Sequence, residues 1–432
     1  MNAYFYTMGC KVNQYETQTM RQALEAEGYQ TYELAVNQTG VGEGAIVINS
    51  CTVTGESDRK LRKLLRRLRR QHPSAVMVLT GCLPQAFPNQ ADALPGADIV
   101  LGNANRADLP RRLREFYANR QRVVDVVPHS AQYDTPTICD FEGRTRAFVK
   151  IEDGCNRFCS YCIIPYARGR VRSKPLEVLK SEVTELVQKG YREVVLVGIN
   201  LTAYGQDCGL CIADAVECVC AVEGICRVRL GSIEPDHMTD ELIGRLAACE
   251  KLCPQFHVAL QSGCNATLKR MNRHYTTTEF YEVCEKLRQA FPNAALTTDI
   301  MVGFPGETKE EFEQSFNFAE KVGFSRVHCF PYSPREGTPA AKAENQVPQN
   351  EKNRRNRLMI AMGERCRDAY AQTLVGTTVE VLPESVCENG WREGYTATYV
   401  PVFSDAAEEG VPVLVHIDRH ENGVCYGKVQ LS

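Results

Sequence analysis

The sequence predicts an α/β protein in three parts: a parallel α/β domain, a partial (β/α)6 barrel and a small all-β barrel. Length is the first indication, because 432 residues suffice for two to four domains. Short apolar runs then alternate with helical stretches up to about residue 366, whereas from residue 370 onward short strands follow one another directly. The hydrophobic fraction of 44% and the charged fraction of 24% are ordinary globular values, which excludes a disordered or fibrous chain.

The first part covers residues 1–128. Its apolar runs at 3–8, 45–50 and 75–80 are short and rich in β-branched or aromatic residues, which is typical of strands. A polar or helical stretch follows each run, so we expect parallel strands with helices packed on the sheet. Residues 129–143, with scattered polar residues, are expected to form a linker.

The second part covers residues 144–366 and repeats the strand–helix alternation six times. Its expected strands lie at 146–151, 193–198, 227–230, 256–260, 296–302 and 327–330. Six such units indicate a partial (β/α) barrel. The third part covers residues 370–432 and is expected to be a small β-barrel with strands at 378–382, 395–402, 411–417 and 424–430.

Composition and the first residues narrow the location. No run reaches the ~18 apolar residues of a membrane span, and the start lacks the basic and apolar regions of a secretory signal. We therefore expect a cytoplasmic protein with no membrane partner. Twenty cysteines are many for a reducing compartment, where they serve as core residues, metal ligands or reactive groups.

The segment CNRFCSYC at 155–162 gives the strongest chemical signal. It places Cys155, Cys159 and Cys162 directly after an expected strand, and this spacing can present three thiolates to one inorganic cluster. A structural zinc site needs four ligands, and no fourth lies at the expected distance. A [4Fe–4S] cluster on three thiolates keeps one iron open for a substrate or cofactor. The segment therefore predicts a reactive iron–sulfur cluster rather than three core cysteines.

A second set of cysteines is distributed through the first part. Cys10, Cys51 and Cys82 each follow one of its three expected strands. Because parallel strands end at the same edge of a sheet, these thiols are expected to converge on one crevice. Helix N-termini that follow there favour the ionised, metal-binding thiolate. We therefore expect a second three-cysteine iron–sulfur cluster.

Two such cysteine sets in this order, followed by a small β-barrel, resemble the methylthiotransferase family of the radical S-adenosylmethionine (SAM) superfamily. The first part resembles the family's auxiliary-cluster domain, the second its radical SAM barrel and the third its TRAM module. The resemblance runs along nearly the whole chain. It includes the segments 197–200, 232–235, 261–263 and 302–308, which stand at or just past the ends of expected barrel strands, where barrel active sites are built.

The resemblance implies two [4Fe–4S] clusters and SAM as cofactors. The open iron at Cys155, Cys159 and Cys162 would bind SAM and split it, giving a 5′-deoxyadenosyl radical that removes hydrogen from carbon 2 of a modified adenine. The cluster at Cys10, Cys51 and Cys82 would deliver the methylthio group. The residues implied to contact SAM are Tyr161, Asn200, Ser232, Glu234, Gln261 and Gly303.

Residues 9–17, which read GCKVNQYET, resemble one branch of the family. That branch is a transferase in tRNA modification and acts on N6-threonylcarbamoyladenosine next to the anticodon. The branch for isopentenyladenosine favours Gln-Met-Asn in this region, and the branch for a ribosomal-protein aspartate favours Pro-Lys-Asn. Both branches stay open as alternatives, as does a non-enzymatic iron–sulfur protein that binds RNA.

A basic run at 59–70 favours RNA as the substrate. Four leucines thread the run at helical spacing, so one face of a helix should pack on the sheet while the other presents cations, with Ser57 or Asp58 as the cap. Because the run holds no acidic residue, a phosphate partner is favoured over a merely solvated face. The members of this run expected to bind RNA are Arg59, Lys60, Arg62, Lys63, Arg66 and Arg67.

Further partners follow from other segments. A second basic patch after the cysteine segment, together with two residues beside the first cysteine, adds Arg168, Arg170, Arg172, Lys11 and Asn13 to the expected contacts with the tRNA anticodon loop. The tail is net acidic, so three roles stay open for it: RNA contacts through aromatics such as Trp391, Tyr395 or Tyr399, a cover for the site, or selection of the substrate by excluding other RNA. We also expect an electron donor such as flavodoxin or ferredoxin, and a monomer. The remaining cysteines, including the group at 208–226, are expected to be apolar core residues.

Overall fold

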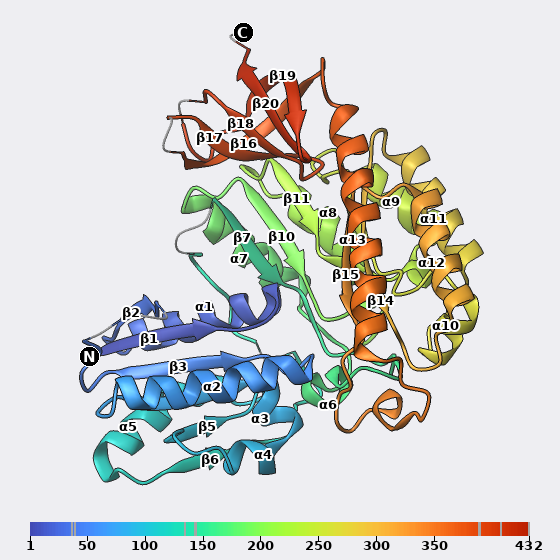
Figure 1. Cartoon of the computed structure of the whole chain (residues 1–432). Coiled ribbons are helices and arrows are strands. Elements are labelled where there is room, and N and C mark those ends of the chain that lie inside the picture. Colours follow the sequence, from blue (N-terminus) through green and yellow to red (C-terminus); the bar gives the residue numbers. More distant parts are fainter. Residues whose placement is uncertain are drawn as a thin grey trace.

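The computed structural model describes residues 1–35, 38, 40–133, 135–141, 145–387, 390–406 and 408–430. The expected linker at 129–143 lies partly outside these residues. Figure 1 shows an N-terminal α/β domain in blue and teal, a barrel from green to orange, and a β-barrel in red above it. In the described part of the chain, no helix combines the length and hydropathy that crossing a membrane requires.

Parallel strands form the sheet of the N-terminal domain, in the order β2-β1-β3-β4-β5-β6. The strands are β1 (Asn2–Thr7), β2 (Gln30–Glu33), β3 (Ala45–Ser50), β4 (Val76–Gly81), β5 (Ile99–Leu101) and β6 (Val123–Asp125). The order reverses between β1 and β3, which is the switch point where open α/β sheets form a crevice at the carboxyl ends of their strands.

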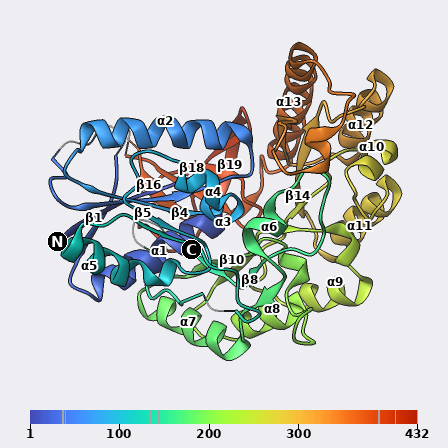
Figure 2. The same cartoon turned by 90° about the horizontal axis from the view of Figure 1, so that it is seen from below.

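Helices cover both faces of this sheet, with α2 on one side and α1 and α5 on the other (Figure 2). They are α1 (Lys11–Glu25), α2 (Gly55–Gln71), α3 (Cys82–Ala86), α4 (Pro88–Asp92) and α5 (Leu109–Asn119). Alternate residues of β3 separate two cores, because Ile46 and Ile48 pack with α2 while Ala45 and Val47 pack with α1 and α5.

Helix α2 confirms the amphipathic pattern of the basic run but not its expected cap. Leu61, Leu65 and Leu68 are buried against the sheet. The helix begins one residue after Thr54, whose hydroxyl accepts a hydrogen bond from the Ser57 N–H at 3.1 Å. The cap therefore precedes the predicted position, since Ser57 donates rather than accepts this bond.

The barrel has its parallel strands in the order β7-β10-β11 and then β12-β13-β14-β15, with β11 continuing into β12 across Gly231. These strands are β7 (Arg146–Lys150), β10 (Glu193–Val197), β11 (Arg227–Leu230), β12 (Ser232–Ile233), β13 (Gln255–Val258), β14 (Ala295–Val302) and β15 (Arg326–Pro331). Val195, Phe256 and Ile300 lie in its buried core. The expected six-unit partial barrel is confirmed.

The helices of the barrel are α6 (Ile164–Arg168), α7 (Leu176–Gln188), α8 (Ile212–Cys220), α9 (Asp240–Ala247), α10 (Asn265–Arg270), α11 (Thr277–Ala290), α12 (Lys309–Val322) and α13 (Gln349–Gln372). Helix α13 lies along β15 and leads to the tail (Figure 1). It buries Met359 and Met362 against the barrel core. The boundary expected at residue 366 falls inside this helix.

The tail is a closed barrel in the order β16-β17-β18-β20-β19. Its strands are β16 (Thr378–Val386), β17 (Arg392–Thr396), β18 (Pro401–Ser404), β19 (Val413–Glu421) and β20 (Val424–Val429). The run at 395–402, which was predicted as one strand, is the end of β17, a turn and the start of β18. The turn contains Tyr399 at a φ of 65°, a conformation that interrupts a strand.

Candidate active site

The cysteine segment of the barrel forms a loop between two short antiparallel strands, β8 (Glu152–Asp153) and β9 (Arg172–Ser173). Gly154 opens the loop at a φ of 94°, and a Cβ there would lie 1.9 Å from the Arg170 carbonyl oxygen. Only glycine permits this approach of two chain segments. The Cys162 N–H donates to the Cys159 carbonyl at 2.9 Å, and burial raises the pKa of the Cys162 thiol to about 12, with Cys159 next to it adding to the effect.

Arg273 contacts one of these thiols. Its Nη1 donates to the Cys159 Sγ at 3.4 Å, and its Nη2 forms an ion pair with Glu234. The Arg273 side chain is almost fully buried, and its Nε donates to the Tyr275 hydroxyl at 3.1 Å. Arg273 therefore links a cysteine of the loop to a residue at the end of a barrel strand.

The second set of cysteines stands at the expected edge of the N-terminal sheet. Cys10 follows β1, Cys51 follows β3 and Cys82 follows β4. Gly9 has a φ of 102°, and a Cβ on it would lie 2.8 Å from the Cys51 Cβ. The glycine thus allows the turn after β1 to approach the turn after β3. Burial raises the pKa of the Cys51 thiol to about 12, and the neighbouring thiols Cys82 and Cys10 raise it further.

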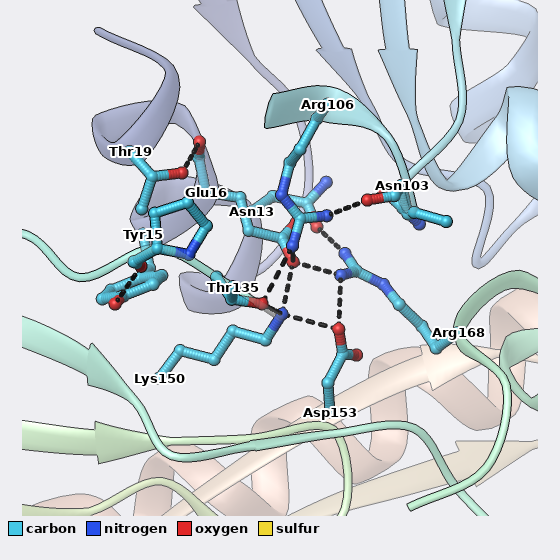
Figure 3. A network of polar contacts seen from close by, with 12 residues as sticks. Asn13, Tyr15, Glu16, Thr19, Asn103, Arg106, Thr135, Lys150, Asp153 and Arg168 are labelled. Carbon is cyan, nitrogen blue, oxygen red and sulfur yellow. Dashed lines mark hydrogen bonds and ion pairs between the residues drawn. The ribbon is translucent and has the colours of Figure 1, made fainter. Parts of the chain in front are cut away.

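A buried polar network begins on α1, just after Cys10 (Figure 3). Glu16 is fully buried, and its carboxylate contacts Arg168, lies 2.8 Å from the Lys150 Nζ and lies 3.0 Å from an Nη of Arg106. Burial alone would raise the pKa of Glu16, but these three cations hold it well below its usual range. Glu16 is therefore ionised inside the protein.

Asp153 extends the same network into the barrel. Its carboxylate lies 2.6 Å from Lys150, 3.4 Å from Arg172 and 3.7 Å from Arg168. Burial alone would lower the pKa of Arg168. Cys82 and the carboxylates of Glu16 and Asp153 outweigh it and raise this pKa well above its usual range. The network therefore ties α6, which follows the barrel cysteines, to the helix that follows Cys10.

A cavity of about 720 Å³ lies where the three parts meet. Cys10 and Lys11 line it from the N-terminal domain, Tyr399 from the tail, and the ends of several barrel strands from the remaining side. Lys11 lies 5.7 Å from the Phe148 ring centre, and burial, aided by Arg229 and Arg146, lowers its pKa to about 8. The barrel residues that line the cavity are Val197, Gly198, Arg229, Leu230, Gly231, Ser232, Gln255, His257, Thr297, Asp299, Arg326 and His328.

A smaller cavity of about 210 Å³ lies beside the barrel cysteines. Cys162, Tyr161 and Gln261 line it, and the Tyr161 ring packs edge-on against Phe304 at 6.2 Å between ring centres. Asp299 lines both cavities. The Cys10 side of the molecule and the Cys162 side therefore meet at one residue of β14.

Both sets of thiols fit a [4Fe–4S] cluster better than a single metal ion. In the described part of the chain, no three His, Cys, Asp or Glu side chains converge closely enough to hold one ion, whereas a cluster distributes its thiolates over separate irons. The network beside Cys82 has four buried cations against two carboxylates. That positive surplus suits the anion formed by a cluster and three thiolates.

The residues expected to contact SAM lie in three different settings. Tyr161 and Gln261 line the smaller cavity, and Ser232 lines the larger one. Asn200 is buried, and its side-chain oxygen accepts a hydrogen bond from the Thr202 hydroxyl at 3.3 Å. Glu234 is paired with Arg273, while the N–H of Gly303 donates to Glu307. Of the six, the first three line one of the two cavities.

The residues expected to bind RNA divide into an exposed group and a buried group. Arg59, Lys60, Lys63 and Arg66 are exposed on α2, and Arg62 and Arg67 are half-buried. Arg59 pairs with Glu56, and Arg62 donates to Gln90 at 3.1 Å. In the described part of the chain, Arg59 and Arg69 are the cations of α2 that form ion pairs. The others have no ion-pair partner there, and four of them are exposed, namely Lys60, Lys63, Arg66 and Arg70.

The second basic patch is not a surface patch. Arg168 is fully buried and Arg172 is 3% exposed, and both form ion pairs with Asp153. Asn13 is 1% exposed and donates to the Ser50 carbonyl at 3.1 Å. These three side chains hold the interior together and cannot reach RNA. Arg170 is exposed.

The acidic character of the tail has a structural explanation. Glu380 lies 2.6 Å from Arg227, and Glu384 lies 2.8 Å from Arg146, so tail carboxylates pair with barrel arginines. The rings of Tyr395 and Tyr399 are stacked at 4.9 Å, and the Arg146 guanidinium lies 4.8 Å from both. The tail is therefore fixed on the barrel by its own acids and aromatics, and Tyr399 closes one side of the larger cavity.

Sequence reasoning missed the polar wall of the larger cavity. Thr297 and Asp299 alternate along β14, and Arg326 and His328 alternate along β15. Side chains two residues apart share one face of a strand. This alternation of polar residues could therefore have predicted that both strands present a polar face to a cavity. Arg273 was also missed, and it lies in a loop with no motif.

The arrangement defines a class of protein. A parallel barrel whose first strand leads into a CxxxCxxC loop, with a pocket beside the third cysteine, is the arrangement of a radical SAM enzyme. The radical SAM superfamily model matches residues 149–319, and the model of uncharacterized protein family UPF0004 matches residues 2–102. Among solved structures, the radical SAM methyltransferase TsrM of Kitasatospora setae shares the fold, with a TM-score of 0.57, 14% identity, and coverage of 79% of this chain and 77% of that chain.

Full-length relatives give the family. The chain is 39% identical to threonylcarbamoyladenosine tRNA methylthiotransferase MtaB of Bacillus subtilis, over 99% of this chain and 95% of that protein. It is 40% identical to the MtaB of Thermotoga maritima over 91% of this chain and 89% of that protein. It is 35% identical to tRNA-2-methylthio-N(6)-dimethylallyladenosine synthase of Clostridium botulinum, over 89% of this chain and 86% of that protein. The chain belongs to the radical SAM methylthiotransferase family.

Proposed function

We propose that this enzyme inserts a methylthio group at carbon 2 of N6-threonylcarbamoyladenosine beside the tRNA anticodon. The observation that carries the proposal is that Cys10 of one set and Cys162 of the other each line a cavity, and that Asp299 lines both cavities. Full-length relatives with this activity in their names support the choice of nucleoside. The cofactors are SAM and two [4Fe–4S] clusters, one on Cys155, Cys159 and Cys162 and one on the other set.

The clusters, when bound, supply the electron that splits SAM and the sulfur that is transferred. The chain's own residues hold and enclose the reactants. Arg273 holds Glu234 and the Cys159 sulfur in place, and Tyr161 offers an aromatic wall beside Cys162. Tyr399 and its ion-paired tail cover the larger cavity and limit the entry of water.

The tRNA is proposed to lie across α2. Its unpaired cations Lys60, Lys63 and Arg66 face solvent on a helix that follows Cys51. Single-stranded anticodon loops present both phosphates and unstacked bases, so the target adenine can leave the loop and enter the cavity. The free positive charge of α2 would hold the backbone while the cavity holds the base.

An acidic one-electron carrier such as flavodoxin or ferredoxin is proposed to approach the loop at Phe158. This residue lies between two barrel cysteines and is 39% exposed. Its ring lies 5.8 Å from that of the exposed Tyr166 and 5.2 Å from the guanidinium of the exposed Arg170. We further propose that the enzyme is cytoplasmic, as its tRNA substrate requires, and that it acts as a monomer.

Mass spectrometry of tRNA nucleosides tests the function. Anaerobically reconstituted protein, SAM, a reductant and tRNA carrying threonylcarbamoyladenosine should give the methylthio nucleoside together with 5′-deoxyadenosine. Cys155→Ala should abolish both products. Cys226 was expected in the core, but it is exposed, as are Cys139 and Cys208. Cys226→Ala, outside both sets, should leave both products unchanged. Product on isopentenyladenosine tRNA instead, or on a ribosomal-protein aspartate, would overturn the proposal. Absence of deoxyadenosine with intact clusters would indicate a non-enzymatic protein.

A further inference from the structure

The larger cavity has an uneven distribution of charge. Arg326 begins β15 and is exposed to the cavity, and it has no hydrogen-bond or ion-pair partner among the residues that the structure describes. Lys11, which lines the cavity from the N-terminal domain, also lacks an ion-pair partner among these residues. Arg229 differs, because its Nε lies 3.1 Å from the Glu193 carboxylate. Two cations therefore line the cavity without an ion-pair partner in the described part of the chain.

His328 stands beside Arg326 on the same face of β15. Burial lowers the pKa of His328, and the charge of Arg326 lowers it further, so at neutral pH the imidazole is uncharged. It can then donate a neutral hydrogen bond to a ligand. The strand's other face points away, because Val327 and Cys329 pack against the barrel core.

The one carboxylate that lines the cavity belongs to Asp299, and it lies next to His257. It lies 3.4 Å from the His257 Nε2, while the His257 Nδ1 lies 3.0 Å from the Thr297 hydroxyl. The Arg326 guanidinium itself has donors and no acceptor among the described residues, and an anionic group of a ligand would supply that acceptor.

We propose that Arg326, with His328 and Lys11, binds the carboxylate of the threonylcarbamoyl group and so selects this nucleoside. The inference rests on the proposed function, and it names the residues that read the modification. A threonyl group ends in a carboxylate and a hydroxyl, whereas an isopentenyl group is wholly apolar. A planar guanidinium can hold a carboxylate through two parallel hydrogen bonds.

The cavity also provides the reason for rejecting the apolar nucleoside. An isopentenyl group in the same position would exclude water from Arg326 and Lys11 without giving either cation a partner. Leaving a charge unpaired costs more than a merely missing contact. Cavities of about 300 to 1,000 Å³ hold ligands of nucleoside size, and this one has about 720 Å³.

The test measures binding of anticodon stem-loops to the reconstituted protein, without turnover. Three stem-loops are compared: one with threonylcarbamoyladenosine, one with its methyl ester, which lacks only the negative charge, and one with unmodified adenosine. The unchanged protein should bind the free acid about tenfold more tightly than the ester. Arg326→Gln should bind acid and ester equally, with its affinity for the unmodified stem-loop unchanged.

Arg357→Gln is the matched control, because Arg357 is exposed on α13 and does not line the cavity. It should retain the tenfold preference. If Arg326→Gln weakens all three stem-loops equally, Arg326 binds a phosphate and the inference is overturned. If Arg326→Gln keeps the preference for the acid, the carboxylate lies elsewhere.

A separate measurement tests the proposed function itself. Product analysis of the unchanged protein decides whether threonylcarbamoyladenosine is methylthiolated at all. Product formed with a preference that Arg326→Gln leaves intact would refute the inference alone. No product, or product on isopentenyladenosine, would refute the function on which it rests.

Discussion

The two sets of cysteines reach similar surroundings by different routes. Cys155, Cys159 and Cys162 stand in one loop, so their proximity is local and needs only the turn at Gly154. Cys10, Cys51 and Cys82 come from three strand ends and meet because the strands are parallel and the sheet order reverses between β1 and β3. The first set can be recognised from its spacing in the sequence alone. The second set can be recognised only once the order of the strands in the sheet has been predicted correctly.

The neighbours of the two sets differ in charge. The auxiliary side has ionised Glu16 among arginines, with a pKa held well below its usual range although burial alone would raise it. On the barrel side, burial raises the pKa of Glu152 to about 8, and the Asn200 N–H, which donates to its Oε2 at 2.7 Å, only partly offsets this. A salt-bridge network therefore supports the first set, and Arg273, a buried arginine that donates to the Cys159 sulfur, supports the second.

Removing Arg168 should have the largest effect, because it breaks the network at its centre. Arg168→Ala leaves Glu16 and Asp153 with fewer cations in a buried site, which we expect to cost about 3 to 5 kcal/mol of unfolding free energy. Urea unfolding measures the change. Arg170→Ala, two residues away and exposed, should change stability by less than about 0.5 kcal/mol. Equal losses in both variants would contradict the role of the network.

Glu152→Gln tests the contrast between the two carboxyl groups. A folded-state pKa of about 8, above the usual value of 4.5, means that the unfolded chain loses this proton first as pH rises. The folded protein is therefore progressively destabilised between about pH 4.5 and pH 8, by up to a few kcal/mol. The amide cannot ionise, so its thermal midpoint should fall less from pH 6 to pH 8.5 than that of the unchanged protein. Parallel curves would show that Glu152 is ionised throughout.

Arg273→Gln should weaken the barrel set alone. A hydrogen bond to a charged partner contributes about 1.5 to 3 kcal/mol, so we expect SAM cleavage to slow about tenfold to a hundredfold. The electron paramagnetic resonance spectrum of the barrel cluster should shift, while that of the other cluster stays unchanged. Arg270→Gln, which removes a partly exposed arginine paired with Glu311, serves as the control. A shift in the spectra of both clusters would mean that the substitution disturbs the structure as a whole, which would contradict a local role of Arg273.

The smallest of these effects is expected when cations are removed from α2, and it concerns the salt dependence of tRNA binding. If four cations of α2 contact phosphates, a fourfold rise in salt weakens binding about fiftyfold. Lys63→Ala combined with Arg66→Ala removes two contacts and should reduce that factor to about sevenfold. Filter binding at two salt concentrations measures both. An unchanged factor would place the RNA away from α2.

What the sequence could predict is limited in the same way: local patterns can be recognised, whereas contacts between distant residues cannot. Long strands such as β14 and the leucine pattern of α2 stand out, while β5 and β6, with three residues each, do not. Arg168 was expected on the surface because a run of basic residues looks the same whether it faces water or a buried Glu16. That distinction depends on a contact between residues 152 positions apart.

The central claim is that two separate clusters face neighbouring cavities that share Asp299, and iron content tests it most directly. The unchanged protein, reconstituted without oxygen, should hold about eight irons per chain. Cys10→Ala, Cys51→Ala and Cys82→Ala together should leave about four, with SAM cleavage retained and methylthiolation lost. A triple alanine variant at the exposed Cys139, Cys208 and Cys226 should keep all eight. About four irons in the unchanged protein, with none lost from the first variant, would contradict the account.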